Sequence, residues 1–307
     1  MPRHEWPADF FQPTNRPVTT DPAAHTNHTG SRGALFSEAT AVEPSDDALR
    51  VDGAAGTTTR WSGNIAEGWA IAGNANGGYV LAIAGRAMTA ALGRPDPVTV
   101  TAHYLAPGQP GPVSVVVDIT KQGRKFGTAT AKVADEKRVI LQVLGTFGDL
   151  ADVAGPELID VEPPPMPPPD KCIPMPVSDP SRPPFMGNVD LQLHPEDAGF
   201  LHGEPSGNAL MRGWFRLHNE EAVDAIALLC AADSFPPAIF NTTLPRGWTP
   251  TMELTVHVRS RPGSGWLRCR FATRFVTGGF LEETGELWDD DGRLVAQSRQ
   301  LALVPRD

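Results

Sequence analysis

Two stretches of this sequence repeat each other across half of the chain. The segment Val98-Thr-Val-Thr-Ala-His-Tyr104 is similar to Met252-Glu-Leu-Thr-Val-His-Val258, which lies 154 positions later. A second pair, Arg138-Val-Ile-Leu-Gln142 and Arg293-Leu-Val-Ala-Gln297, is 155 positions apart. Self-similarity at one spacing over half a chain is typical of two fused copies of one fold. The chain of 307 residues has room for two domains of about 120 to 150 residues each.

The first half predicts one helix followed by an antiparallel meander. A β-favouring run over 57–61 leads into a glycine-rich loop, and the apolar stretch after Asn76 has the length and pattern of a helix. Four strands follow, separated by turns rich in glycine, proline and charged residues, over 97–105, 112–121, 128–133 and 138–147. A strand, a long helix and then four strands is the order of a hotdog fold, in which one sheet wraps a buried helix.

The second half predicts the same elements in the same order. Strand patterns occupy 187–194 and 209–217, the apolar face of Glu220–Ala232 predicts a helix, and a meander starts at Thr251. We therefore expect an α+β protein, a tandem (double) hotdog in which each half is an antiparallel sheet wrapped around one long helix. Two such sheets would pair edge to edge, with the ligand site between the halves.

Two segments lie outside this repeat. The run Pro163-Pro-Pro-Met-Pro-Pro-Pro169 favours an extended backbone that cannot donate hydrogen bonds, so it predicts a semi-rigid linker over 151–185. Residues 1–30 lack hydrophobic periodicity and predict a disordered lead. The expected domains are thus an N-terminal hotdog over 31–150 and a C-terminal hotdog over 186–307.

Charge and cysteine content argue against several classes of function. The net charge of −10 disfavours contact with a phosphate backbone, and no basic cluster offsets it, so no nucleic-acid partner is expected. The three cysteines are far apart and form no CxxC pair, which predicts neither disulfides nor a zinc site and favours a cytoplasmic location. No apolar stretch is long enough to cross a bilayer, so we expect no membrane insertion. No metal or other cofactor is expected.

The start of the first helix is a candidate substrate-binding segment. Asn76 is a helix-capping residue, and Gly77 and Gly78 leave the first turn without side chains ahead of Tyr79. The free N–H groups and the positive end of the helix dipole would then suit a polarised ligand oxygen. An equally good explanation of the two glycines is a tight packing contact with another element.

Six short motifs are spread over both halves. They are Asn76-Gly-Gly-Tyr79, Thr101-Ala-His-Tyr-Leu-Ala-Pro-x-x-Pro-Gly111, Gln122-Gly-Arg124, Ala231-Ala-Asp-Ser234, Thr251-Met-Glu-Leu254 and Val295-Ala-Gln297. As a set they resemble the acyl-CoA thioesterase II (TesB-like) family of double-hotdog proteins, over about residues 36–307 apart from the linker. The resemblance implies hydrolysis of a fatty or other acyl-CoA to the free acid and CoA.

The resemblance also implies a catalytic set. In that family an Asp, a Thr and a Gln hold the attacking water, and Asp233, Thr251 and Gln297 are similar to them. Asp233 follows a predicted helix end, where burial and the helix dipole would raise its pKa and make it a better general base. Strand alternation would turn Thr251 away from the face that covers the helix, unless the strand begins irregularly after Pro250.

Other features leave alternatives open. Arg124, on a predicted turn, is a candidate contact for the phosphates of CoA. His103 and His257 recur at matching strand positions, which favours a shared structural role over catalysis. A non-catalytic acyl-CoA or lipid-binding protein remains an alternative function. So does a hotdog enoyl-CoA hydratase or dehydratase, although that branch has an Asp five residues before a His and the spacings here are four. The acyl chain and a homo-oligomer of double hotdogs stay undetermined.

Overall fold

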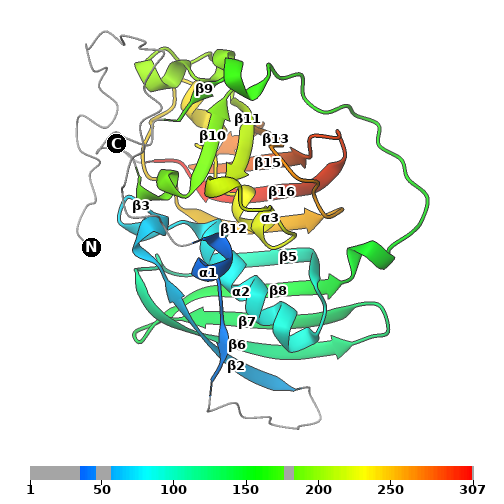
Figure 1. Cartoon of the computed structure of the whole chain (residues 1–307). Helices are drawn as coiled ribbons and strands as arrows, with labels where there is room; N and C mark the ends of the chain where they lie inside the picture. Colours follow the sequence, from blue (N-terminus) through cyan, green and yellow to red (C-terminus); the bar gives the residue numbers. More distant parts are fainter. Residues whose placement is uncertain (1–34, 46–56, 176–182, 306–307) are drawn as a thin grey trace.

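The computed structural model describes residues 35–45, 57–175 and 183–305, which form one long antiparallel sheet (Figure 1). The strand order is β1-β2-β6-β7-β8-β5-β12-β16-β15-β13-β11-β10-β9, and β14 pairs with β15. The predicted lead over 1–30 lies outside the described residues. Within the described ranges, no helix is long and apolar enough to cross a membrane.

The elements follow the predicted order in both halves. The first half contains α1 (Phe36–Ala39), β1 (Glu43–Pro44), β2 (Thr58–Ile65), β3 (Ala70–Ile71), β4 (Asn74–Ala75), α2 (Gly77–Leu92), β5 (Asp96–Tyr104), β6 (Gly111–Gln122), β7 (Gly127–Ala134) and β8 (Val139–Gly148). The remaining elements are β9 (Ile173–Pro174), β10 (Val189–Leu193), β11 (Leu210–Leu217), α3 (Ala227–Ala231), β12 (Thr251–Val258), β13 (Leu267–Ala272), β14 (Val276–Thr277), β15 (Phe280–Trp288) and β16 (Leu294–Leu303).

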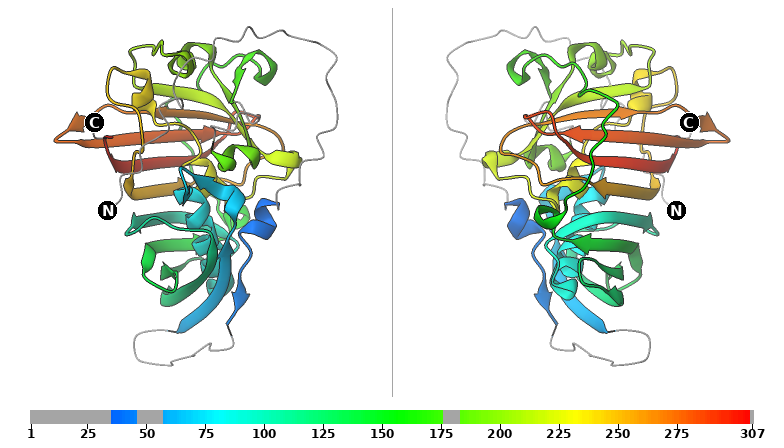
Figure 2. Two further views of the ribbon diagram at one scale, coloured as in Figure 1. Left: turned by 90° about the vertical axis from the view of Figure 1, so that its left-hand side faces the viewer. Right: turned by 90° about the vertical axis from the view of Figure 1, so that its right-hand side faces the viewer.

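The two halves join where β5 pairs with β12 at the centre of the sheet (Figure 2). Thr101 and Thr255, the residues related by the repeat spacing, lie directly opposite each other, and their hydroxyl oxygens are 2.9 Å apart. Strands on either side of this pair correspond one to one, because β8, β7, β6 and β2 match β16, β15, β13 and β11 in order. The sheet therefore has an approximate two-fold relation through this threonine pair, which confirms the double hotdog.

Helix α2 is the buried helix of the first half. Its apolar residues pack onto β5 to β8, the Asn76 side chain caps its N-terminus by accepting from Tyr79 N at 2.8 Å, and Gly93 ends it in the left-handed conformation with φ of 60°. Only Gly reaches such a φ without strain, so the helix stops there.

The second helix is much shorter than the expected Glu220–Ala232. Only Ala227–Ala231 is α-helical, because Asn219 and Glu220 have positive φ and turn the chain out of a helical path. The Asp224 side chain then accepts from Ala227 N at 2.7 Å, which caps a helix that begins late.

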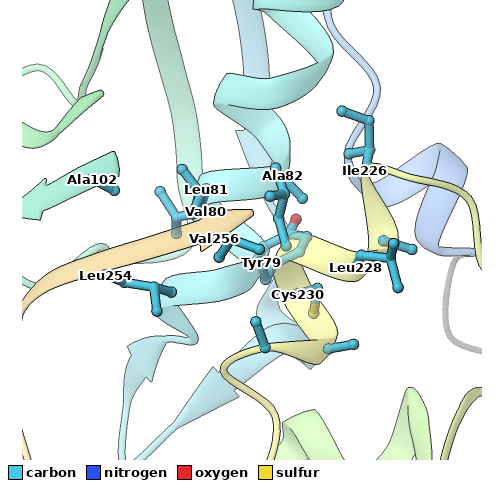
Figure 3. Packing of buried hydrophobic residues seen from close by; sticks show 14 of the residues in the cluster. Tyr79, Val80, Leu81, Ala82, Ala102, Ile226, Leu228, Cys230, Leu254 and Val256 are labelled. Carbon is cyan, nitrogen blue, oxygen red and sulfur yellow. The ribbon is translucent and has the colours of Figure 1, made fainter. Parts of the chain in front are cut away.

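The helices meet at the centre of the core, as Figure 3 shows for Tyr79, Ile226 and their neighbours. The contact is close because Gly85 of α2 faces the side chains of Ile226 and Leu229, where an added Cβ would lie 3.1 Å from each. Packing at this distance leaves no room for a larger residue on α2.

The described part of the predicted linker lies against the second half. Trp214 Nε1 donates to Pro167 O at 2.8 Å, and β9 adds to the sheet edge beside β10. The proline-rich run is thus held by hydrogen bonds to its carbonyl groups, which proline can still provide.

Candidate active site

A cavity of about 440 Å³ opens between the two halves. Its walls come from the N-terminus of α2, the end of β5, the segment after α3, and the inner face of β12, β16 and β15. Asp233, Thr251 and Gln300 all line it, together with many apolar side chains. A largely apolar pocket with a few convergent polar groups is the usual form of a small-molecule site.

Asp233 connects the second half to the first turn of α2. Its Oδ2 atom accepts from Gly78 N at 2.8 Å and from Asn76 Nδ2 at 3.3 Å. The same Asn76 amide donates to the main-chain oxygen of Asp233 at 2.7 Å. Asn76 therefore caps α2 with its side-chain oxygen and holds Asp233 with its nitrogen.

The glycines that open α2 are required by this contact. A Cβ on Gly77 would lie 2.8 Å from the Tyr104 ring and 2.9 Å from Asp233 Oδ2. A Cβ on Gly78 would lie 2.8 Å from the Asp233 Cβ and from Leu229 O. Of the two explanations for the glycines, the tight packing contact is the one that this geometry favours, and Gly78 N already donates to the Asp233 carboxylate.

Burial raises the pKa of Asp233 to about 6, although hydrogen bonds from Gly78, Gly77 and Asn76 lower it. Desolvation dominates because the carboxyl lies deep between the start of α2 and the segment after α3, where it is only partly open to the cavity. At pH 7 the group remains mostly ionised yet is more basic than an ordinary aspartate. A carboxylate in this state suits a general base.

Thr251 faces the cavity because β12 begins with a β-bulge. The register shifts between Thr251 and Glu253, so Thr251 pairs with Ala302, a fully buried residue on the inner face of β16. Gln300, two residues before Ala302, shares that face, and its Nε2 donates to Thr251 Oγ1 at 2.6 Å. The irregular strand start is the condition under which Thr251 was expected to point inward.

Gln297, the glutamine expected beside Thr251, lies on the outer face of the sheet. It is exposed, pairs in register with His257 and Glu286, and does not line the cavity. Gln300 lies three positions further along β16, and an odd difference in position turns a side chain to the opposite face of a strand. The sequence held a signal against Gln297: it has a repeat counterpart in Gln142, which is typical of a structural role shared by both halves. Gln300 instead corresponds to Gly145.

Tyr79 supports the core instead of the cavity. It is fully buried, its hydroxyl donates to Ala39 O at 2.7 Å and accepts from Ala66 N at 3.1 Å, and its ring stacks on Trp69 at 4.7 Å. Burial raises the pKa of Tyr79 to about 12. The structure therefore places Tyr79 in the core and not at the expected contact with substrate in the cavity.

Arg124 lies on the exposed turn between β6 and β7, at the end of the sheet where β5 begins. The cavity is at the other end of β5, beside Tyr104, roughly 26 Å away at about 3.3 Å per residue. The structure therefore does not bring Arg124 to the cavity. Arg138 is better placed, because this exposed side chain donates to Pro107 O at 3.3 Å and Pro107 lines the cavity.

Tyr104 is a further polar residue of the cavity that the sequence did not single out. It follows buried Ala102 by two residues on β5 and so points to the inner face. Its hydroxyl is buried and, within the described residues, has no hydrogen-bond partner. Burial and the charge of Asp233 raise the pKa of Tyr104 well above its usual value, so the hydroxyl keeps its proton.

A metal-ligand pattern occurs once in the described part of the chain, at Asp289, Asp290 and Asp291. These residues do not line the cavity, and Arg293 forms an ion pair of 2.7 Å with Asp289. The cavity itself brings together carboxyl, hydroxyl and amide groups suited to hold water.

Comparison with known proteins agrees with this fold. The model of the acyl-CoA thioesterase N-terminal domain matches residues 65–148, and that of the C-terminal domain matches residues 169–304. A candidate thioesterase II of Thermobifida fusca is 30% identical, with a TM-score of 0.75 over 88% of this chain and 97% of its own. The acyl-CoA thioesterase II TesB2 of Mycobacterium marinum, 18% identical, shares the fold with a TM-score of 0.61 over 89% and 99% of the two chains.

An uncharacterized protein of Mycobacterium tuberculosis is 27% identical over 89% of this chain and 99% of its own length. The two family models together span most of the sequence, one in each half of the double hotdog. Fold, repeat and family models therefore lead to the same conclusion: this chain belongs to the TesB-like family of acyl-CoA thioesterases.

Proposed function

We propose that this enzyme hydrolyses the thioester of an acyl-CoA with a water molecule held by Asp233, Thr251 and Gln300. The observation that carries the proposal is the meeting of these three side chains in one cavity, with the pKa of Asp233 raised to about 6 by burial. Gln300 replaces Gln297 in this set because it hydrogen-bonds to Thr251 and faces the cavity.

The contacts suggest a role for each group. Asp233 Oδ2 is taken up by Gly78 and Asn76, which leaves Oδ1 to accept a proton from water. Thr251 Oγ1 accepts from Gln300, so its own hydrogen is free to donate to the water or to the developing oxyanion. Water attacks the carbonyl carbon while its proton passes to Asp233, the C–S bond then breaks, and the proton goes to the departing CoA sulfur.

The CoA portion is proposed to extend from the cavity past Arg138. This guanidinium is exposed beside Pro107 at the cavity wall, where it can meet phosphate oxygens. The net charge of −10 repels the anionic phosphates of CoA at long range, so a local cationic contact is needed to hold them at the cavity.

The proposal is tested by release of free thiol from short, medium and long acyl-CoAs, with the native protein and Asp233→Asn. The Asn side chain keeps the size of Asp233 and can still accept from Gly78, but it cannot take a proton. We expect kcat/KM to fall by about 100-fold or more, the scale of a lost general base. Undiminished thiol release in the variant would reject Asp233 as the base.

Two other outcomes separate the alternative functions. Tight binding of acyl-CoA without thiol release from any substrate would favour a non-catalytic binding protein. Loss of the enoyl absorbance from an enoyl-CoA, with its thioester intact, would favour a hydratase.

A further inference from the structure

A second buried carboxyl lies in the wall of the cavity and has no part in the proposed hydrolysis. Glu283 of β15 is 9% exposed and lines the cavity. Its Oε2 atom accepts from Ala238 N at 2.6 Å, and within the described residues no other hydrogen bond to this carboxyl is seen. Burial, and to a lesser extent the charge of Asp233, raises the pKa of Glu283 to about 7.

Glu283 continues a row of polar residues that crosses three strands. Gln300 is its direct register partner on β16, and Thr251 lies one strand further on β12. Side chains of directly opposed residues start about 5 Å apart, and two strand spacings amount to roughly 10 Å. Glu283 is therefore within reach of the acyl chain, a few bonds beyond a thioester carbonyl held near Thr251.

Burying the Glu283 carboxyl beneath a bound substrate costs free energy unless a group on that substrate forms a hydrogen bond with it. Apart from a few polar groups such as Gln300, the cavity wall is largely apolar and includes Phe271, Phe240 and Leu303. A plain alkyl chain placed against Glu283 would strip water from the carboxyl and return no hydrogen bond. A hydroxyl group on the chain would return one, because it can donate to a carboxylate and accept from a carboxylic acid.

We propose that Glu283 is a specificity-determining residue that binds a hydroxyl group on the acyl chain, so that the preferred substrates are hydroxyacyl-CoAs. This inference rests on the proposed thioesterase function. An acyl chain that ends in a carboxylate is disfavoured by the same cavity, because Asp233 and Glu283 both carry negative charge when ionised.

The kinetic test compares octanoyl-CoA with 3-hydroxyoctanoyl-CoA and 8-hydroxyoctanoyl-CoA. With the native enzyme we expect kcat/KM for one hydroxylated substrate to exceed that for octanoyl-CoA by about tenfold, the worth of one good hydrogen bond. Glu283→Leu should abolish this preference while keeping hydrolysis of octanoyl-CoA. Equal kcat/KM values for all three substrates, or a preference that survives in Glu283→Leu, would overturn the proposal.

Glu283→Gln is the second variant, since its amide oxygen can still accept from Ala238 N and preserve the local fold. It should retain part of the hydroxyl preference, because an amide also hydrogen-bonds to a hydroxyl. Glu286→Gln, on the opposite face of the same strand, is the matched control and should leave the substrate ratio unchanged. A shift in the control as large as that in Glu283→Gln would count against a specific contact.

A binding measurement keeps the inference separate from the proposed function. Calorimetry with the thioethers S-octyl-CoA and S-(8-hydroxyoctyl)-CoA, together with S-(3-hydroxyoctyl)-CoA, requires no hydrolysis. Tighter binding of one hydroxylated thioether, lost in Glu283→Leu, would support the role of Glu283 even if no thioester were cleaved. Equal binding of all three thioethers by the native protein would overturn that role, whatever the hydrolysis assay showed.

Discussion

The two halves of this protein build the same sheet and then use equivalent positions in opposite ways. The polar row Thr251, Gln300 and Glu283 of the second half corresponds, by the repeat spacing and by register, to Pro97, Gly145 and Ala129 of the first. Even the bulge that turns Thr251 inward has a counterpart, because the register of β5 shifts between Pro97 and Thr99.

Helix length explains why the row of the second half faces the cavity while its counterpart in the first half is covered by α2. Helix α2 runs for 16 residues, and its last turns lie over the small residues of the first half. Met88 would be 3.1 Å from a Cβ on Gly145, and Leu92 would be 2.9 Å from one on Gly127. Helix α3 ends after five residues, and the cavity opens above Gln300 and Glu283. The comparison teaches that shortening one helix of a repeated fold can create a site while the other helix fills its equivalent.

The largest expected effect contrasts the two faces of β16. Gln300→Leu removes the donor to Thr251 and should lower kcat/KM by about 100-fold, as expected for a lost polar group that positions the reacting water. Gln297→Leu, on the outer face, is the matched control and should change kcat/KM by less than about twofold. Thiol release from one acyl-CoA measures both, and a larger effect at Gln297 would reject the assigned face.

The pH dependence tests whether the site works through one basic carboxylate. Asp233 must be ionised to accept a proton, and its pKa is about 6, so kcat/KM should fall about tenfold for each pH unit below 6. Glu283, with a pKa near 7, titrates in the same cavity, so the profile is measured in Glu283→Gln as well. Activity that stays level down to pH 4 in that variant would contradict a raised pKa at Asp233.

A polar substitution in the first half tests whether α2 fills the position that is open to the cavity in the second half. Gly145→Gln copies the second half, but its Cβ alone would lie 2.9 Å from the Phe147 ring and 3.1 Å from Met88, closer than van der Waals contact. We expect a loss of about 1 to 3 kcal/mol in the free energy of unfolding, typical of overpacking. Denaturant unfolding would show this, with Gln142→Ala on the outer face of β8 as the control. An unchanged midpoint would mean that α2 does not fill this position.

The smallest expected effect concerns the two arginines at opposite ends of β5. Arg138→Ala, beside the cavity, should raise KM for acyl-CoA by about two- to fivefold, the scale of an exposed ion pair, with kcat unchanged. Arg124→Ala should leave KM unchanged. A KM increase confined to Arg124→Ala would restore the original assignment, and the effect at Arg138 should weaken at high salt.

Much of the fold was predictable because its signals are local and repeated. Strand alternation, turn residues and the 154-residue spacing predicted the double hotdog, which the strand order and family models confirm. The length of α3 was not predictable from its apolar face, since the positive φ of Asn219 and Glu220 breaks the helical path there. Among the candidate site residues, Asp233 and Thr251 do line one cavity, while Tyr79 and Arg124 do not.

What the sequence by itself determined is the repeated architecture, the family and the types of residue available for catalysis. The repeat counterpart Gln142 argued against Gln297, but it could not place Gln300 beside Thr251, because only the register of β12 and β16, with its bulge, decides which face points inward. The sequence also could not show that the N–H of Gly78 is engaged by Asp233, since these residues are 155 positions apart. Contacts between distant segments depend on how the two halves pack, and only the tertiary structure brings them together.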